Sequence, residues 1–117
     1  MAAFKTDTLD TILHRRREAQ EQERQVLLAR VYHTLDRLSP VYGLDHVYIF
    51  GSLIRPWTFS ADSDIDLAVE SLEPEPFFSL MGILATELGR EVDLIDLSRC
   101  HFASKIRQEG RLWTAVH

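Results

Sequence analysis

The sequence predicts an α/β (α+β) fold in which a small mixed β-sheet is flanked by helices. Three short apolar runs, over residues 46–50, 65–69 and 92–97, are rich in β-branched and aromatic residues and predict strands. A long segment without glycine or proline precedes them, and helix-forming stretches follow the second and third runs. Strands interleaved with helices in this way form a sheet that helices cover, mostly on one face.

Length and composition indicate one compact domain. We expect residues 1–117 to form a single unit, with a helical segment at 1–40 and the core of the domain at 45–116. The net charge of −5 argues against a protein that grips long nucleic acid through its phosphates. The first ten residues lack the apolar centre of a signal peptide, and no apolar run is long enough to span a membrane. We therefore expect a cytoplasmic protein without membrane contact.

The N-terminal segment predicts a helix from residue 7 or 8 to about Leu38, ended by the pair Ser39-Pro40. Its last part carries apolar residues at helical spacing that should pack on the core, namely Leu28, Val31, Tyr32, Leu35 and Leu38. Residues 15–25 are almost entirely polar, and their simplest interpretation is a solvated helix face.

This helix is too long for the expected globule. Unbroken, it would extend roughly 45 Å at about 1.5 Å per residue, whereas a domain of this length is only about 35 Å across. It must therefore break near the polar stretch or overhang the domain. The small apolar stripe of Leu9, Ile12 and Leu13 is then either a frayed start or a contact for a partner protein.

Helices are also predicted after the second and third strands. One runs from about Glu75 to Leu88 and ends at Gly89, and a second covers Ser98 to Glu109. Residues 111–116 are predicted to form a last short strand.

Two carboxylates stand at the start of the second strand. Because side chains alternate along a strand, Asp64 and Asp66 share one face, with Cα atoms about 6.5 Å apart, and Ile65 and Leu67 point to the other. Two carboxylates held this close repel each other. A divalent cation such as Mg²⁺ or Mn²⁺, which prefers hard oxygen ligands, would relieve the repulsion.

A third acid lies inside the third strand. Asp93 is costly there unless it is paired or bound to a metal, and it would join Asp64 and Asp66 if the two strands are neighbours. Alone, it would be interpreted as a surface residue of an edge strand. Asp96 has the opposite parity and is interpreted as a strand-end residue or a cap for the helix that starts near Ser98.

The dipeptide Gly51-Ser52 directly follows the first strand. Glycine allows a backbone to approach a phosphate, and the N–H groups at the start of a short helix bind anions. A phosphate cradle beside a set of metal-binding carboxylates is what nucleotidyl transfer requires.

Together these motifs resemble the minimal nucleotidyltransferases of the DNA polymerase β superfamily. The resemblance rests on Phe50-Gly51-Ser52, on Ser63-Asp64-Ile65-Asp66, on Val92-Asp93-Leu94 and on Glu109-Gly110-Arg111-Leu112, and it covers roughly residues 47–113. It implies the polymerase-β-like fold and transfer of a nucleotide from ATP to a hydroxyl group with two Mg²⁺ ions, Mn²⁺ being possible.

The resemblance also assigns roles to residues. Asp64, Asp66 and Asp93 would be the catalytic, metal-binding residues, with Asp93 able to act as general base, and Gly51 and Ser52 would hold the triphosphate. The loop from Leu53 to Ser63 is one residue longer than the usual spacer, and Pro56 stands where glycine is common. Two readings of Arg55 therefore stay open, a contact with phosphate or a loop-anchoring salt bridge.

Aromatic residues of this loop, Trp57 and Phe59, could stack on a base, although packing against the domain is the simpler interpretation. Trp113 is interpreted as a core or dimer contact.

Such stand-alone domains resemble the antitoxin of HEPN–MNT toxin–antitoxin pairs. The resemblance implies transfer of AMP from ATP to a tyrosine of a HEPN-domain RNase toxin, which would be the partner protein. Two alternatives stay open: an antitoxin that acts by binding alone, and a nucleotidyltransferase for a small molecule or a nucleic acid.

Overall fold

Four strands form one mixed sheet at the centre of the structure, a computed structural model that describes the backbone of residues 2–116 and the side chains of residues 8–116. Strand β1 (His46–Phe50) pairs antiparallel with both β2 (Ile65–Val69) and β4 (Arg111–Thr114). Strand β2 also pairs parallel with β3 (Val92–Asp96), so the strand order is β3-β2-β1-β4. The predicted strands and the mixed sheet are confirmed, each end within two residues.

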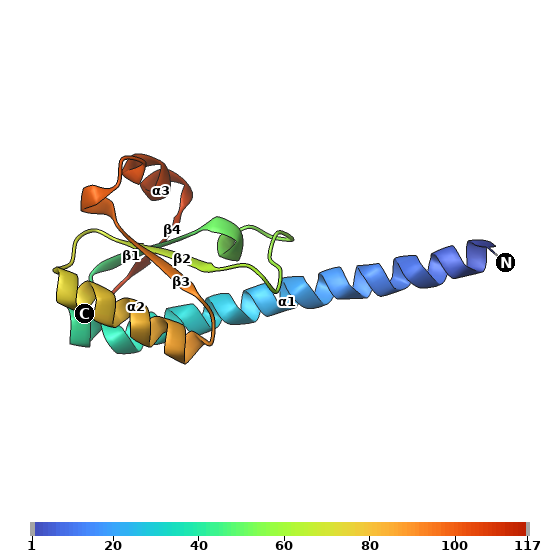
Figure 1. Cartoon of the computed structure of the whole chain (residues 1–117), viewed down its shortest axis with the longest axis horizontal. Coiled ribbons are helices and arrows are strands. Elements are labelled where there is room, and N and C mark those ends of the chain that lie inside the picture. Colours follow the sequence, from blue (N-terminus) through green and yellow to red (C-terminus); the bar gives the residue numbers. More distant parts are fainter. Residues whose placement is uncertain (1, 117) are drawn as a thin grey trace.

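Helices α1 (Ala2–Tyr42) and α2 (Pro74–Leu88) cover one face of the sheet, and the short helix α3 (Ala103–Glu109) lies against the other (Figure 1). Alternation along β2 decides which side chains enter each layer. Ile65, Leu67 and Val69 point into the main core and are almost fully buried. Ala68 belongs instead to a second, smaller cluster, together with Leu97, Ala103 and Ile106.

Helix α1 is continuous and overhangs the domain. It begins at Ala2, earlier than residue 7 or 8, and its N-terminal half projects far beyond the sheet (Figure 1). The molecule consequently measures 63 × 28 × 24 Å along its principal axes. Leu9, Ile12 and Leu13 are about half exposed on this projecting part. None of the helices in the described residues combines the length and the hydropathy that a membrane span requires.

The predicted end of this helix at Ser39-Pro40 is wrong, because α1 continues through Pro40 to Tyr42. Proline has no N–H to donate to the carbonyl four residues earlier, that of Asp36. The hydroxyl of Ser39 donates to this carbonyl oxygen instead, at 3.2 Å. The helix then ends at Gly43, whose φ of +65° suits glycine.

The helix predicted from Ser98 to Glu109 is divided. A short 3₁₀ turn covers Leu97–Arg99, and α3 begins only at Ala103. The Asp96 carboxylate accepts hydrogen bonds from the N–H and the hydroxyl of Ser98, so it caps the 3₁₀ turn. Both interpretations of Asp96 are therefore confirmed, because it is the last residue of β3 and also caps the turn that follows, although the element that it caps is shorter.

Of the two interpretations of Trp113, the core contact is correct within the described chain. Its side chain is only 3% exposed, and its indole N–H donates to the Asp36 carboxylate at 2.9 Å. This bond ties the edge strand β4 to α1.

Candidate active site

Gly51 opens a 3₁₀ turn (Gly51–Ile54) immediately after β1. Its φ is +76°, and a Cβ atom at this position would collide with Oδ2 of Asp66 and lie 3.1 Å from its Cγ. A glycine is therefore required for two reasons, the left-handed backbone and the close approach of a carboxylate. The approach of a phosphate to this partly buried turn, which the sequence predicted as the reason for the glycine, stays a prediction.

The strand pairing brings two of the predicted acids side by side. In the parallel ladder, Asp66 of β2 is the direct partner of Asp93 of β3, at the spacing of neighbouring strands, about 4.8 Å. On its other side, Asp66 pairs with Phe50, the residue before Gly51. Asp64 precedes β2 at the same parity as Asp66. The expectation that these strands are neighbours, with the acids away from the main core, is confirmed.

The electrostatics of Asp66 reflect this crowding. Burial, followed by repulsion from Asp93 and Asp64, raises the pKa of the Asp66 carboxyl to about 6, and only the Arg55 guanidinium acts in the opposite direction. Three oxygen donors that repel one another suit a hard divalent cation chemically. Asp64 and Asp93 are exposed and thus accessible to such an ion.

The three carboxylates are not gathered into a finished metal cage. Within residues 8–116, no three Asp, Glu, His or Cys side chains converge closely enough to hold a metal ion. Asp66 lines one hollow, whereas Asp64 and Asp93 line a different one, together with residues of α2. The assignment of these aspartates as metal ligands and catalytic residues therefore stays a prediction.

A cavity of about 640 Å³ lies beside Gly51 and Asp66, on the α3 side of the sheet. It combines apolar walls with charged groups, and its lining residues are Phe50, Gly51, Ile54, Arg55, Asp66, Phe102, Lys105, Ile106 and Glu109. The sequence interpretation missed the contribution of α3. Phe102, Lys105, Ile106 and Glu109 follow helical spacing, but nothing in the sequence alone shows that this face turns toward Asp66.

The two aromatic residues of the loop after the 3₁₀ turn differ in burial. Phe59 is buried in the main core, as the packing interpretation expects, whereas Trp57 is 56% exposed. Trp57 has a left-handed φ of +69°, and the Arg17 guanidinium lies 6.0 Å from its ring centroid. Arg55 is exposed at the cavity and forms no salt bridge with any described residue, which leaves its side chain available to a ligand.

The polar stretch of α1 is not simply a solvated face. Glu21 and Arg24 are each only 6% exposed, and Arg24 donates to both carboxylate oxygens of Glu21. Glu21 also accepts the backbone N–H of Trp57 at 2.7 Å. The sequence interpretation missed this pair, because one acid and one base three residues apart look the same whether they are buried or exposed.

The buried pair has a consequence for stability at low pH. Hydrogen bonds from Arg24 and from the Trp57 N–H lower the pKa of Glu21 from 4.5 to about 2. A carboxyl whose folded-state pKa is lowered stabilises the fold above its unfolded pKa and loses this contribution as the pH falls toward the folded value. We expect the difference in unfolding free energy between the wild type and Glu21→Gln to be constant above about pH 5 and to shrink between about pH 4.5 and pH 2.

Urea unfolding of both proteins across this range measures the difference, and all other carboxylates cancel from the comparison. A difference that does not change with pH would show that Glu21 titrates normally.

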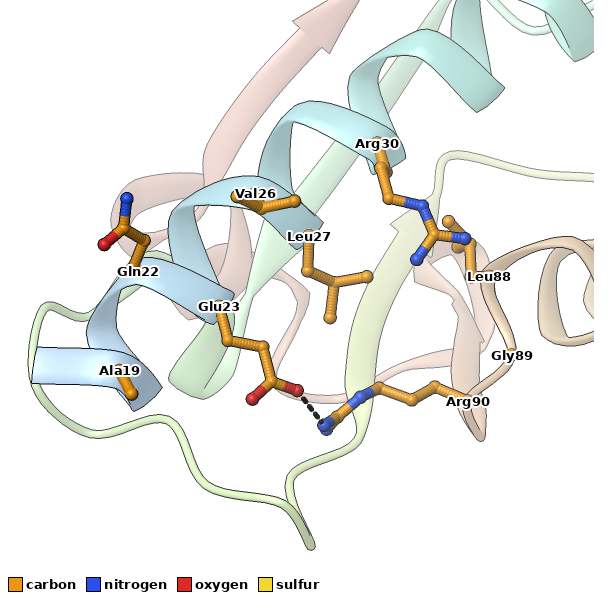
Figure 2. A pocket seen from close by; sticks show the side chains of 9 residues that line it. All are labelled: Ala19, Gln22, Glu23, Val26, Leu27, Arg30, Leu88, Gly89 and Arg90. Carbon is orange, nitrogen blue, oxygen red and sulfur yellow. Dashed lines mark hydrogen bonds and ion pairs between the residues drawn. The ribbon is translucent and has the colours of Figure 1, made fainter. Parts of the chain in front are cut away.

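Another hollow, of about 620 Å³, lies between α1 and the turn that joins α2 to β3 (Figure 2). Glu23 and Arg90 face each other across it and form a salt bridge at 3.0 Å. The charges of Glu23 and Arg90 thus neutralise each other, a third charged residue, Arg30, donates to the Glu87 carbonyl at 3.0 Å, and none of the predicted site residues lines the hollow. We therefore place the candidate site at Gly51 and Asp66.

The family follows from the match of residues 37–114 to the model of the polymerase beta nucleotidyltransferase domain. The match spans more than half of the chain and includes Gly51, Asp64, Asp66 and Asp93. The chain belongs to this nucleotidyltransferase family, and the fold that the resemblance implied is confirmed.

Among solved structures, the chain is similar to proteins from toxin–antitoxin complexes. One similar chain comes from a toxin–antitoxin complex crystallised with AMP-PNP, with 26% identity over 74% of each chain and a TM-score of 0.61. Another comes from the toxin–antitoxin complex MntA–HepT, with 26% identity over 78% of this chain and 73% of the other, and a TM-score of 0.54. The chain is thus similar to MntA-type antitoxins. No curated protein gives a significant sequence match.

Proposed function

We propose that this protein is an antitoxin that transfers AMP from ATP to a tyrosine hydroxyl of a cognate HEPN-domain RNase toxin and thereby neutralises it. The observation that carries the proposal is the register of Asp66 with Asp93 beside Gly51, at the wall of a 640 Å³ cavity. A relative of similar fold was crystallised as a toxin–antitoxin complex with an ATP analogue, which supports both the nucleotide and the partner.

In this proposal, Asp64, Asp66 and Asp93 would hold two Mg²⁺ ions, for which Mn²⁺ could substitute. When bound, the ions neutralise the charge of the phosphates and stabilise the attacking and leaving oxygens. The raised pKa of Asp66 supports this role, because a nearby cation favours the ionised carboxylate that burial and repulsion disfavour.

The remaining groups orient the nucleotide. The Gly51-Ser52 turn and Arg55 contact the triphosphate, and Arg55 is suited to this because its guanidinium forms no salt bridge with a described residue and lies at the cavity, near enough to Asp66 to act on it electrostatically. The tyrosine oxygen then attacks the α-phosphorus, the bond between the α-phosphorus and the bridging oxygen breaks, and pyrophosphate leaves. Asp93 accepts the proton of the hydroxyl.

The test is to incubate the protein with Mg²⁺, the product of the neighbouring gene as the candidate toxin, and ATP labelled either at the α- or at the γ-phosphate. We expect label on a toxin tyrosine from α-labelled ATP and none from γ-labelled ATP, because pyrophosphate carries the γ-phosphate away. Label on a small molecule or on RNA would favour the substrate alternative. Neutralisation of the toxin without any labelling would favour the antitoxin that acts by binding alone.

A further inference from the structure

The buried pair of Glu21 and Arg24 lies in α1, outside residues 37–114, which match the nucleotidyltransferase family. Both side chains are almost completely buried, and two hydrogen bonds join the guanidinium to the carboxylate. Gln25 adds a further hydrogen bond to Glu21 at 3.1 Å. Burying two charged groups is costly unless each forms several hydrogen bonds. The groups to which Glu21 and Arg24 are hydrogen-bonded therefore indicate which part of the structure the pair holds in place.

Those partners lie on both sides of Arg55. Arg24 donates through Nη1 to the carbonyl oxygen of Leu53 at 2.9 Å, and Glu21 accepts the N–H of Trp57 at 2.7 Å. Leu53 is two residues before Arg55 and Trp57 two residues after it. The pair therefore fixes the backbone at both ends of the short segment that presents Arg55 to the cavity.

The conformation of that segment requires external support. Trp57 adopts a φ of +69°, which a residue with a Cβ rarely adopts and which persists only where surrounding contacts impose it. Within the segment, the N–H of Arg55 donates to the carbonyl of Ser52 at 3.2 Å, and the Thr58 hydroxyl donates to the Arg55 carbonyl at 2.8 Å. The bond from Trp57 to Glu21 supplies a contact that comes from outside the loop.

The second half of the loop is attached separately. Arg90 donates to the carbonyls of Ser60 and Ser63 at 3.3 and 2.6 Å, and it also forms the salt bridge with Glu23 that Figure 2 shows. Helix α1 thus holds the segment around Arg55 directly, whereas the part before Asp64 is held by Arg90, which α1 contacts only through Glu23. The two attachments can be perturbed independently.

We propose that Glu21 and Arg24 are positioning residues that place the Arg55 guanidinium for binding the phosphates of the nucleotide. This inference rests on the proposed function. If it is correct, the affinity of Arg55 and the Gly51-Ser52 turn for phosphate depends on two residues of α1 that lie outside residues 37–114, the part that matches the family.

A double-mutant cycle of Arg24→Lys and Arg55→Ala tests the proposal. Lysine keeps the positive charge beside Glu21 but lacks the fork that reaches Glu21 and Leu53 together. We expect each single variant to raise the KM for ATP and the Kd for AMP-PNP with Mg²⁺ about tenfold, the usual cost of one charge-assisted hydrogen bond. We expect kcat to change less than about threefold, because the pair does not touch the reacting atoms.

The double variant should bind AMP-PNP no more weakly than Arg55→Ala alone, because Arg24 acts only through Arg55. Full additivity of the two effects would overturn the proposal. So would an Arg55→Ala protein that binds the analogue normally. The matched control is Arg37→Lys, since Arg37 is on the same helix, pairs with Glu87 and does not contact the loop.

Glu21→Gln provides a second variant if Arg24→Lys does not fold, and it should show the same rise in KM. Hydrogen exchange of the Trp57 amide, measured without nucleotide, should be faster in both variants than in Arg37→Lys. Unchanged exchange would overturn the proposal. A wild type that neither binds nor transfers the nucleotide would instead contradict the proposed function, and the exchange measurement would still report whether the pair holds the loop.

Discussion

Replacing Asp64 and Asp66 together by asparagine is expected to lower the rate of AMP transfer by more than about a thousandfold, which corresponds to about 4 kcal/mol of transition-state stabilisation. Asparagine preserves the size of the side chain but removes the charge that a divalent cation requires. Transfer of label from α-labelled ATP, followed over time, measures the effect.

The same variant should unfold at a temperature equal to or above that of the wild type. Burial and repulsion from its neighbours raise the pKa of Asp66, so its ionised form is unfavourable in the folded protein. Asp62→Asn is the matched control, because Asp62 is an exposed residue of the preceding loop. Transfer that persists in the double variant would remove these aspartates from the mechanism.

Gly51→Ala is expected to impair both folding and catalysis. The left-handed backbone alone costs about 1–2 kcal/mol with alanine, and the collision with the Asp66 carboxylate adds about 1–3 kcal/mol. The new methyl group therefore forces the Asp66 side chain to move from its position. Because a misplacement of about 1 Å can cost about a hundredfold in rate, we expect a loss of at least this size in AMP transfer.

The variant Gly43→Ala separates the two sources of destabilisation, the left-handed backbone and the collision with Asp66. Gly43 has a φ of +65°, close to the +76° of Gly51, but a Cβ there would meet no atom within 4 Å. Urea unfolding of both variants therefore isolates the collision with Asp66 as the difference between them. Equal stability and full activity in both variants would show that the close approach to Asp66 has no role.

Local patterns predicted those parts of the site that depend on a single strand. The alternation of Asp64, Ile65 and Asp66 identified the two faces of β2, and an acid inside an apolar run marked Asp93 before the strand order was known. The opposite parity of Asp96 separated a capping residue from the candidate site. In each case, the alternation of side chains between the two faces of a strand made the prediction possible.

Contacts between distant segments could not be predicted in this way. Glu21 and Arg24 are buried because a loop more than 25 residues away along the chain covers them, and a polar sequence gives no sign of such a cover. Lys105 faces the cavity only because α3 packs on Ala68. Where α1 passes through Pro40, the hydroxyl of Ser39 replaces the missing donor to the Asp36 carbonyl, a local substitution that the pair Ser39-Pro40 does not reveal in the sequence.

The overhang of α1 also determines how the protein behaves hydrodynamically. A compact chain of this length has a radius of gyration of about 13 Å, whereas the elongated shape gives 17.4 Å. The monomer should therefore tumble anisotropically and elute from a sizing column ahead of a sphere of equal mass. An early elution volume is thus what a single chain produces, and its mass has to be taken from light scattering.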